Sequence, residues 1–273
     1  MMTMNQAERR RFLIEALLEE EPEYAGSAVP ADPDSQRQML RGLMNVRPPR
    51  AVPARFQAVQ DEYLREETRR KGIVELSTLS PLAVENGVGL YVWQGDITTL
   101  QVDAIVNAAN SGMTGCYVPN HRCIDNCIHT FAGVQLRQKC ARLMEAQGYE
   151  EPTGQAKLTP GYDLPAKFIL HTVGPIVSGP LTKQPCKLLA SCYRSCLELA
   201  AEKKLESVAF CCVSTGVFGF PNAEASQIAV ETVREFLKKP TNIRQVVFNV
   251  FKDLDKELYT RQLSPSGAAS KGA

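Results

Sequence analysis

The chain has 273 residues, a net charge of +1 at pH 7, 44% hydrophobic residues and 22% charged residues. This length fits one large or two small domains, and the composition is ordinary for a globular protein. The near-neutral charge argues against a general nucleic-acid-binding protein, which would be strongly positive, although a local basic patch is compatible with it. The apolar runs are too short to span a membrane, and residues 1–23 contain no signal-peptide core. We therefore expect a cytoplasmic protein with no membrane partner.

The chain contains nine cysteines, an odd number that argues against a disulfide framework in a protein without an export signal. Most of them are expected to be small buried hydrophobes. Cys192 and Cys196 are four residues apart in a predicted helix, and Cys211 and Cys212 lie in a predicted strand. None of these four has a nearby histidine to complete a metal site.

Residues 1–79 are predicted to form a helical N-terminal extension. Apolar residues recur at helical spacing over 9–18, and further helices are expected over 34–45 and 53–71, separated by proline-containing breaks. No residue in this part carries a chemical signature. We therefore expect it to pack on the main domain, with a partner-binding arm as the alternative.

From residue 88 onward, short apolar strands alternate with helices. The predicted strands cover 90–93, 103–107, 167–171, 207–213 and 244–251, and the predicted helices cover 123–147, 185–201, 222–238 and 253–261. This alternation predicts an α/β domain with a largely buried sheet, spanning residues 80–262. The tail, residues 263–273, is small and polar and is expected to be disordered.

Three potential metal ligands lie within eight residues: Cys116, His121 and Cys123. Gly115 and Pro119 mark this stretch as a loop. Thiolates and imidazole suit zinc, which prefers tetrahedral nitrogen and sulfur coordination. Structural zinc sites usually have four protein ligands, whereas catalytic sites leave one position for water or substrate. The pattern predicts one Zn²⁺ ion with an open position; three unrelated loop residues are the alternative.

Asp125 follows this loop, in the first turn of the next predicted helix. A carboxylate is stabilised there by the helix N-terminus, so Asp125 either caps the helix or is held next to a metal-bound substrate. His129 is too far along the helix to join the same ion. Two thiolates balance the charge of Zn²⁺, and the neutral centre would still act as a Lewis acid at its open position.

A glycine-rich segment, residues 214–221, lies between a predicted strand and a predicted helix. Its glycines, its hydroxyls and the following helix N-terminus suit a backbone cradle for phosphate. It is not a Walker loop, because the Lys-Ser/Thr pair is absent. Residues 95–98 and 107–110 are weaker signals, and the paired asparagines of the latter are equally typical of turns.

Taken in order, these motifs resemble the macrodomain family, specifically its zinc-containing branch. The matching segments are 95–98 (GDIT), 102–110 (VDAIVNAAN), 116–126 (CYVPNHRCIDN), 161–165 (GYDLP), 171–175 (HTVGP) and 214–221 (STGVFGFP). Their order and spacing fit from about residue 90 to 251, and residues 40–49 also resemble this branch. The combination is specific, whereas no single motif is.

The resemblance implies a three-layer α/β/α macrodomain fold with a mixed sheet and with ADP-ribose in a cleft at the strand ends. Asp96 would then bind the adenine amino group, with Ile97 beside it, and Asn110 would hold the distal ribose. The diphosphate and the distal ribose would be wrapped by the loop made of Ser214, Thr215, Gly216, Val217, Phe218 and Gly219.

The resemblance also assigns roles around the loop that contains Cys116, His121 and Cys123. Asp125 falls where hydrolytic macrodomains carry a catalytic aspartate, and Cys123 and Ile124 would join it in contacting ADP-ribose. Those relatives have a glycine-rich stretch where this chain carries its three potential metal ligands. The expected catalytic residues are therefore Asp125, Asn110 and Cys123, with the metal sharing the work.

The function implied is a zinc-dependent hydrolase that removes mono-ADP-ribose from acidic side chains of modified proteins. Its expected partners are ADP-ribose and a mono-ADP-ribosylated protein. A non-catalytic reader of ADP-ribose and a deacetylase of O-acetyl-ADP-ribose are the alternatives, because both would use the same cleft. A purely structural zinc ion is a further alternative.

Overall fold

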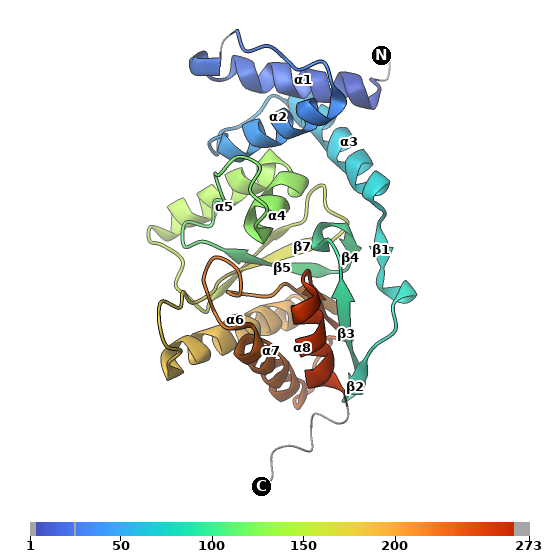
Figure 1. Ribbon diagram of the computed structural model, residues 1–273, viewed down its shortest axis with the longest axis vertical. Coiled ribbons are helices and arrows are strands. Elements are labelled where there is room, and N and C mark those ends of the chain that lie inside the picture. The colour runs from blue at the N-terminus through green and yellow to red at the C-terminus, as the bar shows by residue number, and fades with distance from the viewer. Residues whose placement is uncertain (1–3, 25, 265–273) are drawn as a thin grey trace.

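A computed structural model of the protein describes residues 4–24 and 26–264 (Figure 1). Its centre is a seven-stranded sheet in the order β2-β3-β9-β8-β5-β7-β6. The strands are β2 (Ala83–Glu85), β3 (Val88–Gln94), β5 (Ala104–Ala109), β6 (Ala156–Pro160), β7 (Phe168–Val173), β8 (Ser207–Phe210) and β9 (Gln245–Val250). The five inner strands run parallel, and the edge strands β2 and β6 pair antiparallel. The expected mixed sheet is confirmed.

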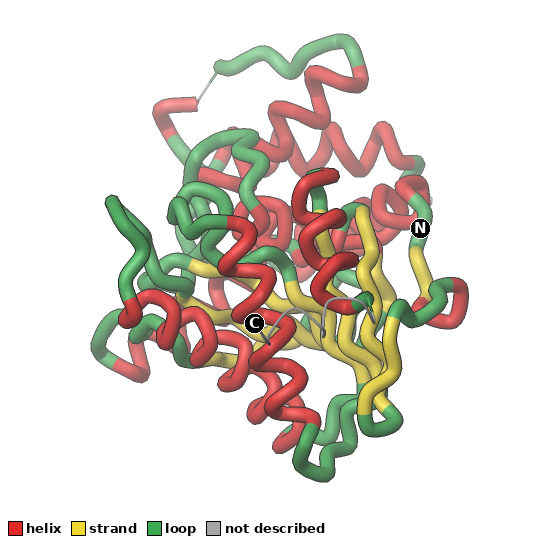
Figure 2. The backbone as a smooth tube through the Cα atoms, turned by 60° about the horizontal axis from the view of Figure 1, so that its bottom comes forward, coloured by secondary structure: helices red, strands yellow, loops and turns green. Residues whose placement is uncertain are grey.

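Helices cover both faces of this sheet (Figures 1 and 2). One layer contains α4 (Ile124–Ala132) and α5 (Val134–Gln147), and the other contains α6 (Lys183–Glu202), α7 (Asn222–Leu237) and α8 (Asp253–Leu263). The inner strands are buried along almost their whole length, as expected for parallel strands with helices on both sides. This arrangement confirms the expected three-layer α/β/α fold class.

The N-terminal helices α1 (Gln6–Glu19), α2 (Pro33–Val46) and α3 (Ala54–Lys71) lie against α4 and α5 (Figure 1). The helix α1 begins with a capping box, in which Asn5 and Glu8 bond reciprocally. The three helices have a hydrophobic core of their own, which Val134 of α5 joins. Its buried members are Leu13, Ile14, Leu17, Leu18, Leu40, Met44, Phe56, Tyr63, Leu64 and Val134. The predicted helical region is therefore packed on the sheet domain through a shared core.

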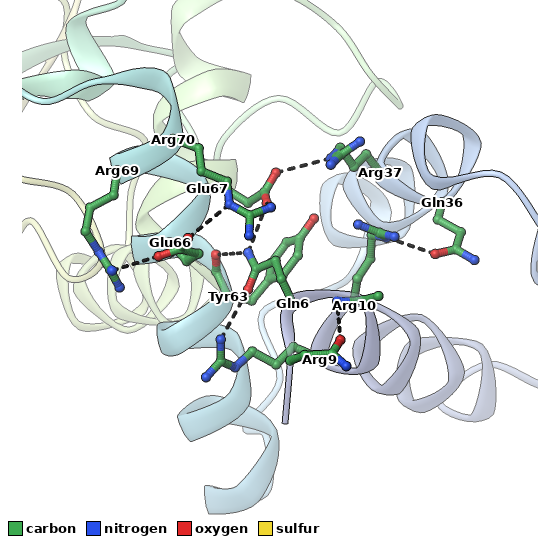
Figure 3. A network of polar contacts seen from close by, with 12 residues as sticks. Gln6, Arg9, Arg10, Gln36, Arg37, Tyr63, Glu66, Glu67, Arg69 and Arg70 are labelled. Atoms are coloured by element: carbon green, nitrogen blue, oxygen red, sulfur yellow. Dashed lines mark hydrogen bonds and ion pairs between the residues drawn. The ribbon is translucent and has the colours of Figure 1, made fainter. Parts of the chain in front are cut away.

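Polar contacts reinforce the packing of α1 on α3 (Figure 3). The amide of Gln6 donates to the backbone oxygen of Tyr63 and to Glu67, both at 2.9 Å. A short parallel pair, β1 (Val74–Glu75) with β4 (Leu100–Gln101), then connects α3 to the sheet domain, near the 3-10 turn η3 (Ile97–Thr99). No helix among residues 4–24 and 26–264 is both long and apolar enough to cross a membrane.

Three details differ from the sequence prediction. The single helix expected over 123–147 breaks at Gly133, whose φ of 91° ends α4 before α5 begins. The edge strands β2 and β6 were not predicted, because β2 has only three residues and the alternation of polar and apolar residues in β6 is weak. Leu263, assigned to the tail, is the buried last residue of α8. The rest of the predicted tail, apart from Ser264, lies outside the described residues.

Candidate active site

The predicted site residues follow the carboxyl ends of neighbouring parallel strands. The strand β5 leads to Asn110 and then to residues 111–123, here called the metal loop, which ends at α4. The adjacent strand β8 leads to residues 214–220, and β3 leads to Asp96. Carboxyl ends of parallel strands lie at one edge of a sheet, which is where ligands bind in open α/β folds. The structure thus places the predicted residues along a common edge.

The metal loop brings its three potential ligands together. One donor atom from each of Cys116, His121 and Cys123 lies within 4.8 Å of the other two, and the Cys116 Sγ atom is 3.5 Å from His121 Nδ1. All three side chains are half-buried. Burial, together with the nearby Cys116, raises the pKa of Cys123 to about 12, and a cation between the two thiols would counter this. Soft donors at this spacing fit a zinc ion.

Asn126 fixes the loop from within α4. Its Nδ2 atom donates to the backbone oxygens of Cys116 and Val118, at 3.3 and 3.0 Å, and its side chain is fully buried. The thiol sulfur of Cys123 accepts the backbone N–H of Asn126 at 3.4 Å, so Cys123 is the N-cap of α4. The start of α4 therefore holds both cysteines in place.

The N-terminal helices also hold the metal loop, which the sequence analysis missed. Arg41 of α2 donates to the backbone oxygen of His121 at 2.7 Å and to Asn126 Oδ1 at 3.0 Å. Asn45 accepts the backbone N–H of Asn120 at 2.9 Å. The resemblance of residues 40–49 to the zinc-containing branch was the one signal in the sequence that pointed to these contacts. The helical region thus supports the candidate site directly.

Arg137 of α5 connects the metal loop with the C-terminal end of α2. Its guanidinium donates to the backbone oxygens of Thr114 and Cys116 in the metal loop, at 2.7 and 3.4 Å. It also donates to the backbone oxygens of Asn45 and Arg47, at 2.6 and 2.7 Å. Because Arg137 is almost fully buried and has several acceptors, it stabilises the loop against α2.

Asp125 lies in the first turn of α4 and is 5% exposed. Its Oδ1 atom accepts from Asn107 Nδ2 at 2.8 Å, and its Oδ2 atom accepts from Asn110 Nδ2 at 3.3 Å. Burial raises the pKa of Asp125 to about 6, against the lowering effects of the Asn107 hydrogen bond and the Arg137 charge. At neutral pH this carboxyl is therefore largely ionised and held through both oxygens.

A second group of metal-type side chains lies behind Asp125. Donor atoms of His129, Cys140 and His171 are also within 4.8 Å of one another, and all three residues are buried. The His129 Nε2 atom is 3.6 Å from Asp125 Oδ1. The two nitrogens of His171 contact Asn107 Nδ2 at 3.2 Å and Thr159 Oγ1 at 2.9 Å. This group was not predicted from the sequence, because its members are far apart along the chain.

The glycine-rich segment after β8 is built around a buried serine. Ser214 has a φ of 65°, and its buried hydroxyl has no hydrogen-bond partner among the described residues. An added Cβ at Gly174 would lie 2.1 Å from that hydroxyl, so only glycine fits opposite it. Gly216 has open space around it, and Val217 is 82% exposed. The segment therefore offers an unpartnered hydroxyl next to accessible backbone, as a phosphate cradle requires.

Asp96 lies at the far end of the same edge, before η3. Its Oδ1 atom accepts from the backbone and the hydroxyl of Thr98, at 3.0 and 2.6 Å, and its Oδ2 atom is 3.0 Å from Lys71 Nζ. Burial opposes ionisation, but the Lys71 charge and the Thr98 hydrogen bonds lower the pKa of Asp96 below its usual value. Ile97 beside it is buried. The last residue of α3 thus contacts the residue expected to bind adenine.

Comparison with known proteins agrees with this geometry. The Macro domain family model matches residues 106–229. A Protein-ADP-ribose hydrolase of Treponema medium is 57% identical over 261 residues, covering 96% of this chain and 100% of that protein. A Protein-ADP-ribose hydrolase of Staphylococcus aureus (strain MSSA476) is 48% identical over 252 residues, covering 92% of this chain and 93% of that protein. The chain belongs to the macrodomain family. Within it, the chain groups with the protein-ADP-ribose hydrolases, whose members match it almost from end to end.

Solved macrodomain structures share the fold. The Trypanosoma brucei macrodomain in complex with ADP-ribose superposes with a TM-score of 0.63 and 30% identity, covering 82% of this chain and 95% of that chain. The Oceanobacillus iheyensis macrodomain with ADP gives a TM-score of 0.60 and 39% identity, covering 65% of this chain and 91% of that chain.

Proposed function

We propose that this macrodomain is a zinc-dependent hydrolase that releases mono-ADP-ribose from acidic side chains of modified proteins. The relatives named Protein-ADP-ribose hydrolase support the reaction class. One observation carries the more specific proposal: the three potential ligands of the metal loop lie beside the Asn110–Asp125 pair, at the edge where β5 ends.

The ligand would lie along the common edge of the strands. Asp96 and Ile97 would receive the adenine, residues 214–219 the diphosphate, and Asn110 the distal ribose. The unpartnered buried hydroxyl of Ser214 supports the diphosphate position, because a buried donor without an acceptor is costly unless a ligand supplies one. The Trypanosoma brucei macrodomain, solved with ADP-ribose, supports the ligand class.

Cys116, His121 and Cys123 would hold the zinc ion. Bound there, zinc would supply a Lewis-acid position for a ribose hydroxyl or for water. The fit rests on the soft donor set, on the mutual distances within 4.8 Å and on the half-exposed position of the loop. The cluster contains three such residues among those described, and a three-ligand site of this kind would suit a catalytic rather than a structural zinc ion.

The side chains of the protein would perform the proton transfer and the positioning. Water adds to the anomeric carbon of the distal ribose while the bond from that carbon to the carboxylate oxygen of the modified residue breaks. Asp125 accepts the proton of the attacking water, and the Asn110 amide, which bonds Asp125 Oδ2 at 3.3 Å, keeps carboxylate and ribose aligned. The products are ADP-ribose and the restored acidic side chain.

The same chemistry favours acidic linkages over serine linkages. A side-chain carboxylate has a pKa of about 4, so it departs as an anion without taking up a proton. A serine alkoxide is far more basic and needs a general acid. With a pKa of about 6, Asp125 is mainly ionised at neutral pH and acts as a proton acceptor rather than a donor.

The test is a release assay on three peptides that carry mono-ADP-ribose on glutamate, serine or arginine, each with zinc-loaded and zinc-stripped protein. We expect ADP-ribose to be released only from the glutamate peptide and only by the zinc-loaded protein. Binding of all three peptides without release would identify a reader instead. Release from the glutamate peptide by zinc-stripped protein would contradict the role of the metal.

A further inference from the structure

A pocket of about 440 Å³ opens next to the metal loop, between that loop and helices α2, α3 and α4. Its volume is in the range of pockets that bind small ligands or side chains. The loop contributes Asn120 and Arg122, and α4 contributes Thr130 and Phe131. The charged residues that line it are Arg37, Arg41, Arg122 and Glu67. Three of the four are therefore positive.

One of these positive charges is already balanced. Arg37 pairs with Asp34 at 2.7 Å and with Glu67 at 3.3 Å (Figure 3). Glu67, the one acidic residue of the lining, also accepts from Gln6 at 2.9 Å. Its charge is therefore engaged on the α1 and α3 side of the pocket, and it does not neutralise the remaining arginines.

Arg41 and Arg122 have no carboxylate partner among the residues that the structure describes. Arg41 uses one nitrogen to bond the backbone oxygen of His121 and the Asn126 side chain, and its buried Nε atom has no acceptor. Arg122 is exposed and makes no hydrogen bond or ion pair within the described parts of the chain. Arg41 is half-buried and Arg122 is exposed, so two guanidinium groups without a carboxylate partner are accessible here and are complementary to an anion that arrives with a ligand.

The position of these two arginines indicates which ligand. Arg122 lies between His121 and Cys123 in the sequence, and Arg41 bonds the backbone of His121. The pocket therefore adjoins the place where the bond between ribose and acceptor side chain would be cleaved. One extended residue spans about 3.3–3.6 Å, so side chains that flank the acceptor would reach the pocket.

We infer that this pocket binds acidic side chains that flank the modified residue in the protein substrate. Arg122 at the rim would attract and bind a flanking carboxylate, and Arg41 inside would receive it. The inference rests on the proposed hydrolase function and adds a substrate preference to it: an ADP-ribosylated residue within an acidic segment.

The test uses two peptides with mono-ADP-ribose on a central glutamate, one flanked by aspartate and glutamate, the other by asparagine and glutamine. For the wild-type protein we expect kcat/KM to be about tenfold higher for the acidic peptide, mainly through KM, because a charge-assisted contact is gained on binding. In Arg122→Gln this ratio should fall to within about twofold of unity, and in Arg122→Glu it should invert. Turnover of the neutral peptide and zinc content should stay unchanged, which reports an intact metal loop.

A matched control is Arg194→Glu, which makes the same charge change at an exposed position of α6, on the other face of the sheet (Figure 1). It should retain the wild-type ratio. Equal turnover of both peptides by the wild-type protein, or an undiminished acidic preference in both Arg122 variants, would overturn the inference while leaving the proposed hydrolase intact. Release from neither peptide would overturn the proposed function itself, and this inference with it.

Discussion

The protein contains two groups of histidine and cysteine side chains with similar donor atoms and different surroundings. Cys116, His121 and Cys123 come from one loop and are half-exposed. His129, Cys140 and His171 come from two helices and a strand and are buried. Both groups satisfy the same distance limit of 4.8 Å. Donor type and spacing alone therefore do not distinguish a catalytic metal site from a group of side chains that are buried in the protein interior.

Exposure distinguishes the two groups. The hydrogen bonds do so only in part, because both nitrogens of His129 have no hydrogen-bond partner within the described parts of the chain. Both nitrogens of His171 already have partners, Asn107 Nδ2 and Thr159 Oγ1. The buried group has no surface through which a substrate could reach a metal ion, whereas the loop group adjoins the strand edge. The loop group is therefore the one we propose as the zinc site, and the buried group packs behind Asp125.

Cys123→Ala is expected to have the largest effect, and it tests whether the metal binds in the loop. Cys123→Ala removes one of the three proposed ligands, so the variant should purify without zinc and lose ADP-ribose release by about a thousandfold or more, as expected when several kcal/mol of Lewis-acid assistance disappear. Metal analysis and the release assay on a glutamate-linked peptide measure both effects. A zinc-free variant that retains wild-type turnover would remove the metal from the mechanism.

Asp125 lies between the two groups. Its replacement tests whether it acts on the substrate beside the loop group or only packs against the buried group. Asp125→Asn keeps the shape of the side chain but removes the proton acceptor. We expect kcat to fall by about 100- to 10,000-fold while ADP-ribose affinity and zinc content remain close to wild type. Turnover within a few-fold of wild type would leave Asp125 only a structural role, as the acceptor of the Asn107 and Asn110 hydrogen bonds.

Cys140→Ala is the matched change in the buried group. Loss of a buried side chain leaves a small cavity, so the free energy of unfolding should fall by about 1–3 kcal/mol, measured by urea denaturation. Zinc content and turnover should stay near wild-type values. If this variant, rather than Cys123→Ala, loses the metal, the assignment of the two groups is reversed.

The buried histidines also predict how stability depends on pH. Burial lowers the pKa of His171 to about 3 and that of His129 well below its usual value, so both are neutral in the folded protein. Below about pH 6.5 the unfolded chain binds protons that the folded chain does not. The free energy of unfolding therefore decreases as the pH is lowered, by up to about 1.4 kcal/mol per pH unit for each histidine. His171→Gln should make this dependence shallower between about pH 6 and 4. An unchanged slope would show that His171 is protonated in the folded state.

The sequence predicted those features that depend on neighbouring residues. The helices over 34–45 and 53–71 agree with α2 and α3 to within about a residue, because apolar periodicity and prolines mark them. The metal loop was recognisable because its three ligands lie within eight residues. The break at Gly133 was not, since a positive φ cannot be read from a glycine within a helical pattern.

Contacts between distant segments could not be predicted from the sequence. Arg41 and His121 are 80 residues apart, and nothing in the local pattern of α2 distinguishes Arg41 from Arg37, the other arginine of this helix. The buried group could not be predicted either, because Cys140 and His171 come together only after the sheet has formed. The donor atoms of a local loop are thus predictable, whereas the side chains that hold the loop in place are not.

If zinc in the metal loop makes this cleft a hydrolase, as we propose, ADP-ribose release should follow the zinc content of the protein. Zinc would be removed with a chelator and returned stepwise to wild-type protein and to Cys140→Ala, while ADP-ribose release from a glutamate-linked peptide is measured. We expect activity to disappear with the metal and to return in proportion to zinc, reaching its full value at one ion per chain in both proteins. Full activity in the metal-free protein would contradict it.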